Sequence, residues 1–151
     1  MQLRIVFAAL RAGKHVMTEK PATLSVADWD EMVAVSRECG KILTVHQNRR
    51  WDKDYRIMRE VVESGAIGKV VSIESRVFGT VGAMYGWRAF KAYGGGMVYD
   101  WGVHMFDQLL WMYPDKKIVD VKAELMSILE ANKEVDDYFK VLLKLEGGPV
   151  L

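Results

Sequence analysis

The sequence is poor in the features that mark secreted, membrane-bound or nucleic-acid-binding proteins. It has one cysteine, Cys39, which excludes an internal disulfide and favours a reducing compartment. The net charge is +1, and no basic cluster is longer than Asn48–Arg50, so nothing points to a polyanionic partner. No apolar run approaches the roughly 20 residues of a membrane span. We therefore expect a cytoplasmic protein that binds neither nucleic acid nor membrane.

A metal site is also not expected. The three histidines, His15, His46 and His104, lack the spacing of metal ligands, and no further ligand motif accompanies Asp100-x-x-x-His104. What the chain does have is apolar residues: 50% of its 151 residues are hydrophobic, which suits a globular protein of one domain or parts of two.

The first part of the chain alternates helical and strand-like patterns. Helices are expected over residues 2–12, from Ser25 to Gly40 and from Asp52 to Gly65, with Ser25 and Asp52 as capping residues. Short apolar strands are expected over His15–Glu19 and Ile42–His46. Strand–helix–strand–helix alternation with short connections predicts a parallel α/β sheet.

After Gly68 the pattern changes to longer strands with alternating polarity. Three such segments are Val70–Gly79, Ile118–Ile128 and Val135–Leu145. They predict an open, largely antiparallel sheet with one solvated face. We therefore place a boundary near residue 66 and expect two incomplete domains, 1–66 of α/β type and 67–151 of α+β type.

The stretch from Gly94 to Asp107 is the first candidate for chemistry. Its three glycines have no Cβ, so a flat ligand could approach the backbone closely. On the helix predicted to follow, Asp100, His104 and Asp107 would share one face, where a carboxylate can hold an imidazole for acid–base chemistry. An ordinary glycine loop followed by an Asp–His pair is the alternative.

Two strand ends supply further candidates. Glu19-Lys20-Pro21 follows the first predicted strand, and Gln47-Asn48-Arg49 follows the second. Open α/β sheets bind ligands at the carboxyl ends of their strands. A partly desolvated lysine there could polarise a substrate oxygen. For Lys20 the alternative is a surface lysine in a strand-to-helix turn. For the second strand end the alternative is a polar loop whose arginines pair with nearby carboxylates.

An aromatic and basic loop precedes the glycines and contains Trp87 and Arg88. Aromatic faces stack on sugar or nicotinamide rings, and a guanidinium binds carboxylates or hydroxyls. A hydrophobic cluster beneath a long loop is the competing account.

Taken together, these motifs resemble the Gfo/Idh/MocA family of oxidoreductases, which includes glucose–fructose oxidoreductase and inositol 2-dehydrogenase. The resemblance covers nearly the whole chain and rests on the order and spacing of Ala9–Val16, Glu19–Pro21, Asn48–Trp51, Ile67–Val70, Trp87–Arg88, Gly94–Gly96 and Asp100-x-x-x-His104-x-x-Asp107.

The resemblance implies the C-terminal part of a Rossmann-like parallel sheet in residues 1–66. It implies an open antiparallel sheet domain with helices on one face in 67–151, serving the substrate and homo-oligomer formation. The implied activity is NAD- or NADP-dependent oxidation of a sugar, polyol or related CH–OH substrate.

The resemblance also implies roles for individual residues. Lys20 would activate the substrate hydroxyl, His104 would remove its proton, and Asp100 would orient the substrate and support the imidazole. The residues implied near the cofactor are Glu19, Lys20, Pro21, Gln47, Asn48, Arg49, Trp87 and Arg88.

The sequence departs from the family because no G-x-G-x-x-G follows a strand anywhere. That motif would bind the pyrophosphate at a helix N-terminus. We therefore expect a truncated form that binds dinucleotide weakly or not at all and is inactive alone. Two alternatives remain open: a non-catalytic module that forms homo-oligomers through its sheet, and a hydratase or lyase that uses the same lysine and histidine.

Overall fold

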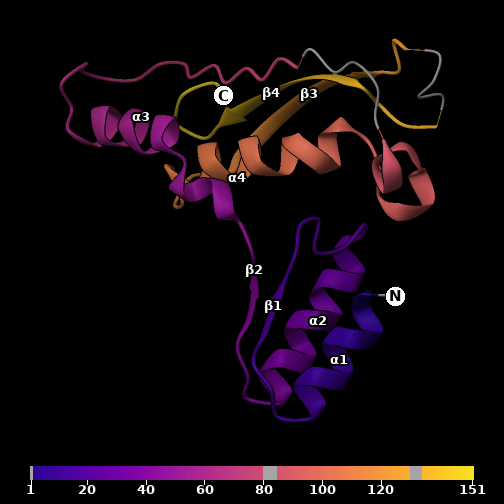
Figure 1. The fold of residues 1–151 in the computed structure, drawn as a ribbon. Helices are drawn as coiled ribbons and strands as arrows, with labels where there is room; N and C mark the ends of the chain where they lie inside the picture. Colours follow the sequence, from indigo (N-terminus) through magenta and orange to yellow (C-terminus); the bar gives the residue numbers. More distant parts are fainter. Residues whose placement is uncertain (1, 80–84, 130–133) are drawn as a thin grey trace. The chain divides into compact units, whose positions relative to one another are not determined.

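The computed structural model describes residues 2–79, 85–129 and 134–151 (Figure 1). The chain forms two compact units, Met1–Gln47 and Asn48–Leu151. The division lies one helix before the boundary expected near residue 66, because helix α3 (Lys53–Glu63) packs with the second unit.

The first unit contains α1 (Gln2–Arg11), β1 (Val16–Thr18), α2 (Val26–Glu38) and β2 (Leu43–Val45). The two strands pair in parallel, with Val16 opposite Leu43 and Thr18 opposite Val45. Figure 1 shows α1 and α2 packed together on one side of this strand pair. The parallel α/β arrangement predicted for this part of the chain is confirmed.

The core of the first unit lies between its helices. Its buried side chains are Val6 and Leu10 from α1 and Met32 and Val35 from α2. They recur at intervals of three or four residues, which places them along one stripe of each helix. Ser25 caps α2 as predicted, since its hydroxyl accepts a hydrogen bond of 3.1 Å from the amide of Asp28.

The second unit is built from two α-helices, several single turns and an antiparallel strand pair. Its elements are η1 (Asn48–Trp51), α3 (Lys53–Glu63), η2 (Gly86–Ala89), η3 (Lys91–Tyr93), η4 (Val98–Gly102), α4 (Val103–Trp111), β3 (Ile118–Met126) and β4 (Tyr138–Leu145). Asp52 occupies the N-cap position of α3 as expected, but its side chain makes no capping hydrogen bond and instead accepts one from Arg49.

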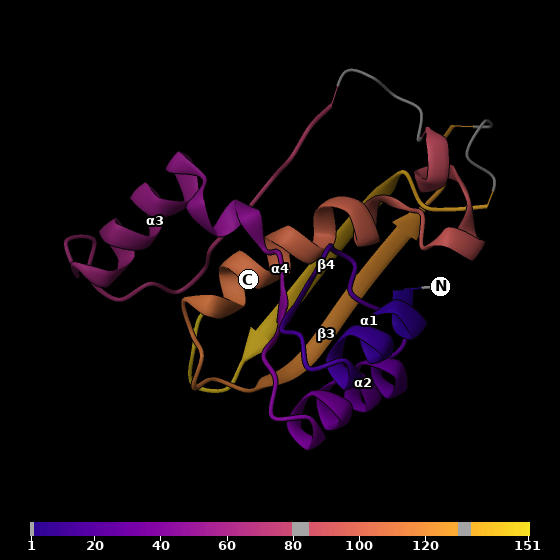
Figure 2. The ribbon, with the colours of Figure 1, turned by 60° about the horizontal axis from the view of Figure 1, so that its bottom comes forward.

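The core of the second unit forms where α4 lies across β4, as Figures 1 and 2 both show. Leu109 of α4 packs against Leu143 and Leu145 of β4 and against Leu151. Alternate residues of β4 face α4, whereas every residue of β3 is exposed. The predicted open sheet with one uncovered face is therefore present, and α4 covers β4 rather than β3.

The segment Val70–Gly79 differs from expectation. It forms no strand; a parallel bridge joins Ser72 to Val150, and Ile73 packs against the core of the second unit. The amide of Ile73 and the carbonyl of Val71 bond to Val150 at 2.9 and 3.1 Å. Within residues 2–79, 85–129 and 134–151, no helix is long and apolar enough to cross a membrane.

Candidate active site

The three glycines before the candidate helix do not form a floor for a ligand. Gly94, Gly95 and Gly96 are buried; backbone atoms fill the space beside Gly95, and side-chain atoms fill the space beside Gly96. A Cβ on Gly95 would lie 2.2 Å from the carbonyl oxygen of Arg88, and one on Gly96 would lie 2.3 Å from Oδ1 of Asp136. The expectation that these glycines line a bound ligand was therefore wrong. They instead allow neighbouring segments of the chain to pack closely.

The helix after the glycines begins with a wide turn. Val98–Gly102 is a π-helix, in which the amide of Val103 bonds to the carbonyl of Val98, five residues earlier. The α-helix α4 starts only at Val103. Asp100 lies in the π-helix and His104 in α4, so the even stacking expected for one continuous α-helix is replaced by a wider turn. Such turns occur frequently at functional sites.

Asp100 is held by an arginine from the preceding loop. Nε of Arg88 donates a hydrogen bond of 2.8 Å to Oδ2 of Asp100, and the two side chains are 30% and 14% exposed. The carbonyl of Arg88 accepts a bond from the amide of Gly96, so both ends of Arg88 fix the η2 turn beside the glycines. The Arg88 guanidinium also lies 4.6 Å from the Trp87 ring centre.

His104 is buried on α4, with 5% of its surface exposed. Its ring meets that of Trp101 edge to face, with ring centres 6.5 Å apart. A buried imidazole near an ion-paired carboxylate is suited to proton transfer, because the surrounding protein limits access of water. The second unit thus contains the Arg88–Asp100 ion pair and, four residues after Asp100 in the chain, the buried imidazole of His104.

Lys20 lies in the first unit, at the turn after β1, and is partly buried. The Lys20–Pro21 peptide bond is cis. The neighbouring Glu19 carboxylate lies 2.8 Å from Nδ1 of His46, the residue that follows β2. This contact links the carboxyl ends of the two parallel strands. The hydrogen bond with His46 is the main reason why the pKa of Glu19 lies below its ordinary value.

The same strand ends offer a partial fit to a dinucleotide. The side-chain oxygen of Gln47 is buried and has no hydrogen-bond partner among the described residues. Such an oxygen suits an amide donor like the carboxamide of a nicotinamide ring. The sequence offers no glycine-rich turn for the pyrophosphate, so these residues fit only the nicotinamide end.

The structure assigns Asn48 and Arg49 to the second unit, in the η1 turn. The Arg49 guanidinium lies 4.0 Å from the Trp101 ring centre. Sequence reasoning missed the partner of Asp107, which is Arg50: the two form a two-point ion pair with bonds of 2.7 and 2.6 Å. Because 57 residues separate them, no local pattern could have indicated the pair.

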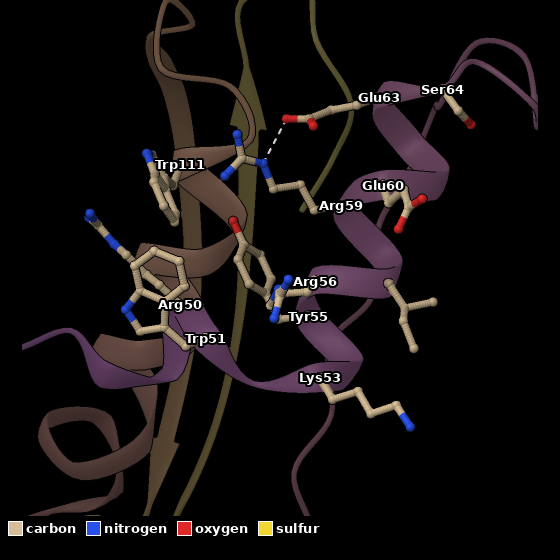
Figure 3. Close-up of a pocket in the computed structure, with 11 residues that line it drawn as sticks. Arg50, Trp51, Lys53, Tyr55, Arg56, Arg59, Glu60, Glu63, Ser64 and Trp111 are labelled. Carbon is tan, nitrogen blue, oxygen red and sulfur yellow. Dashed lines mark hydrogen bonds and ion pairs between the residues drawn. The ribbon is translucent and has the colours of Figure 1, made fainter.

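A cleft of about 690 Å³ lies beside α3, and Figure 3 shows that it contains none of the predicted catalytic residues. In the figure, Trp111, Tyr55 and Arg59 lie close together, and Arg59 is joined to Glu63. The side chains of Trp111, Tyr55, Arg59 and Glu63, which line the cleft, interact with one another. We therefore assign the cleft no part in catalysis.

Comparison with known proteins gives matches over almost the whole chain. Residues 3–47 match the oxidoreductase family NAD-binding Rossmann fold, and residues 55–151 match the GFO/IDH/MocA C-terminal domain. An uncharacterized oxidoreductase of Schizosaccharomyces pombe is 36% identical over 92% of this chain and 38% of its own length. The NADP⁺-dependent scyllo-inositol 2-dehydrogenase of Bacillus subtilis is 32% identical over 95% of this chain and 42% of its own length.

A solved structure is also similar: that of an NAD-binding protein from Listeria innocua. It has a TM-score of 0.92 and 43% identity, and the match covers 99% of this chain and 42% of that protein. The chain therefore spans about two-fifths of the length of these relatives. From the two matched domains we conclude that this chain belongs to the GFO/IDH/MocA family of oxidoreductases.

Proposed function

We propose that this chain forms part of a cytoplasmic NAD- or NADP-dependent oxidoreductase acting on a CH–OH group of a sugar, polyol or related substrate. The observation that carries the proposal is the Arg88–Asp100 ion pair beside buried His104, on a chain that also matches an NAD-binding Rossmann fold. The similarity to an inositol dehydrogenase supports the substrate class.

Each candidate residue has a distinct role in this proposal. His104 accepts the proton of the substrate hydroxyl as a general base, and Asp100 orients the substrate and supports the imidazole. Lys20 donates a hydrogen bond to the substrate oxygen and favours its negative charge. When bound, the nicotinamide cofactor supplies the acceptor for the hydride that leaves the same carbon. The residues that bind that end of the cofactor are Glu19, Pro21, Gln47, Asn48, Arg49 and the Trp87–Arg88 loop.

The test is oxidation of inositols and sugars by the protein translated from the complete reading frame that contains this sequence, followed at the absorbance of the reduced nicotinamide. We expect His104→Asn to lower kcat by about 10² to 10⁴. Its affinity for reduced cofactor, measured by fluorescence, should stay within about threefold of the parent, because His104 does not hold the cofactor. A His104→Asn variant with nearly full kcat would refute the assignment.

For the 151-residue chain alone we expect weak or undetectable dinucleotide binding and no turnover, because it has no glycine-rich turn for the pyrophosphate. Titration calorimetry with NADH and NADPH measures this directly. A dissociation constant in the micromolar range would contradict the expectation.

A hydratase or lyase with the same side chains is distinguished by its product. An oxidoreductase forms one reduced nicotinamide for each ketone or aldehyde, whereas a hydratase or lyase changes the substrate without reducing the cofactor. Product analysis by mass spectrometry in the same assay separates the two.

Association through the uncovered sheet is a second function, and it is compatible with the first. β3 exposes Val119, Val121 and Leu125, each at least half exposed. Val121 and Leu125 pair with Leu143 and Phe139 of β4, so they lie on the α4 side of the sheet, and a partner would bury them beside α4. We expect a homo-oligomer by light scattering, and we expect Val121→Lys to reduce its mass to that of one chain. Lys122→Ala, on the opposite face of the same strand, is the control and should leave the mass unchanged.

A further inference from the structure

Two carboxylates flank His104 in the sequence, and arginines from two different turns bind them. Arg88 of η2 binds Asp100, and Arg50 of η1 binds Asp107. The second pair is the stronger in geometry: Nε and Nη2 of Arg50 donate to both oxygens of Asp107 at 2.7 and 2.6 Å. Such a two-point bond fixes the orientation of both side chains. Asp107 is only 16% exposed, so water screens the pair poorly.

The turn that supplies Arg50 is bonded to α4 at a second point. The side-chain amide of Gln108 donates a hydrogen bond of 2.6 Å to the carbonyl oxygen of Arg49. The same oxygen accepts the bond of 3.2 Å from the amide of Asp52 that closes the turn. Asp107 and Gln108, which are consecutive in α4, therefore bind the side chain of Arg50 and the backbone carbonyl of Arg49.

Apolar packing gives this turn little reason to stay in place. None of the four residues Asn48–Trp51 is buried, and Trp51 is 72% exposed. A short surface turn without buried side chains opens easily unless polar contacts hold it. The contacts that hold it include the two bonds to α4, the ion pair of 2.9 Å between Arg49 and Asp52, and the stacking of Arg49 on Trp101 and of Arg50 on Trp111, at 4.0 and 4.2 Å.

We propose that Arg50 and Asp107 are positioning residues that lock the Asn48–Trp51 turn onto α4. This lock joins the turn and His104 into one rigid group. Asn48 and Arg49 therefore keep a fixed position relative to His104 when they contact the cofactor. The significance for catalysis rests on the proposed function, which assigns those two residues to the cofactor and His104 to proton transfer. The lock itself is a property of the second unit alone.

The test is amide hydrogen exchange by NMR on the 151-residue protein, with the Asp52 amide as the probe because its hydrogen bond closes the turn. We expect Asp107→Asn to speed exchange at Asp52 at least about tenfold. The amides of β3 and β4 should keep their protection. Incorporated fluorotryptophan gives a second signal: the Trp101 resonance should shift as Arg49 loses its fixed position over the ring.

Glu63→Gln is the matched control, because it breaks another ion pair whose arginine, Arg59, also lies on Trp111. It should shift the Trp111 resonance and leave Asp52 exchange and Trp101 unchanged. Arg50→Lys keeps the charge but loses the two-point bond, and should give an intermediate exchange rate. Gln108→Met removes only the uncharged hydrogen bond to the carbonyl of Arg49 and should speed exchange at Asp52 severalfold. This variant still tests the proposal if Asp107→Asn does not fold.

Unchanged Asp52 exchange in folded Asp107→Asn would overturn the proposal. So would an equal rise of exchange across β3 and β4, because the pair would then stabilise the whole unit rather than the turn. No turnover is measured in this experiment. A failure of the oxidoreductase assay would therefore leave the lock standing, and a failure here would leave the activity standing.

Discussion

At the scale of single residues, the buried tyrosine Tyr55 contributes to packing through its ring rather than through its hydroxyl group. Only 3% of Tyr55 is exposed, and its ring stacks on Trp111 with centres 6.4 Å apart. Its hydroxyl makes no hydrogen bond of ordinary geometry within the described residues. Burial accordingly raises the pKa of Tyr55 above its ordinary value. A hydroxyl in this state costs free energy of folding.

We therefore expect Tyr55→Phe to be neutral or to raise the free energy of unfolding by up to about 1 kcal/mol, since it removes an unsatisfied group and keeps the ring. Tyr55→Ala, which also removes the ring, should lower it by about 3 kcal/mol or more. Urea denaturation followed by tryptophan fluorescence measures both. A clear loss of stability in the phenylalanine variant would show that the hydroxyl is bonded in solution.

The exposed Glu19–His46 pair predicts a pH effect in the acid range. The pKa of Glu19 is lowered from 4.5, so the pair contributes stability above that value and loses it as the pH falls through the lowered pKa. The carboxyl carbon of Glu19, observed by NMR, should titrate below pH 4.5, and in His46→Ala its midpoint should move back toward 4.5. A midpoint unaffected by the histidine change would disprove the coupling.

Residue chemistry was only partly predictable from the sequence. The Ser25 cap follows from a four-residue pattern, and it is present in the structure. The ion pairs Arg50–Asp107 and Arg88–Asp100 depend on which turns the fold brings to α4, and charged residues are too common for spacing alone to single them out. The order of motifs could suggest Asp100 and His104, whereas the arginines that hold the neighbouring carboxylates required the structure.

At the scale of elements, the glycine turn before the π-helix is a packing device. Its neighbours are the η2 turn on one side and Asp136 on the other, and Asp136 also accepts a hydrogen bond of 2.8 Å from the amide of Val98 at the start of the π-helix. The sequence correctly predicted the four α-helices and the parallel and antiparallel strand pairs of the described residues, but it also predicted a strand over Val70–Gly79 that does not form. It could not predict the π-helix, because apolar residues at intervals of three and four fit a π turn followed by an α-helix as well as one α-helix.

Gly95→Ala should therefore lower the free energy of unfolding by about 3 kcal/mol, because the new methyl group meets the carbonyl oxygens of Arg88 and Phe90 at 2.2 and 2.9 Å. Gly79→Ala is the control, since nothing lies within 4 Å of its added Cβ and its φ is not positive. It should change stability by less than about 0.5 kcal/mol. Equal denaturation midpoints for the two variants would contradict the packing role.

At the scale of the whole molecule, the chain consists of two units with separate cores. One core is made of Val6, Leu10, Met32 and Val35, and the other centres on Leu109, Leu143, Leu145 and Leu151. The sequence predicted two units but placed the boundary near residue 66 instead of after Gln47. The apolar residues Ile57 and Val61 of α3 are exposed, and only the structure shows that Met58 packs against the second core and that Tyr55 stacks on Trp111.

The two units should differ in stability. The first has 47 residues and a two-stranded sheet, and a domain of that size buries too little apolar surface to be stable by itself. We expect hydrogen exchange followed by mass spectrometry to show faster exchange in α1 and α2 than in β3 and β4. Leu10→Ala should speed exchange throughout the first unit and leave β3 and β4 unaffected. A uniform response along the chain would mean that the two cores unfold together.

The bonding of the Asn48–Trp51 turn to α4 bears on how hybrid enzymes of this family should be assembled. A crossover at residue 66 would take Arg50 from one parent and Asp107 from the other, so that two side chains selected in different backgrounds must form a two-point bond. A crossover between Gln47 and Asn48 inherits both from the same parent. Exchanges of nucleotide preference between relatives should therefore succeed more often when the parental sequences are joined at that peptide bond.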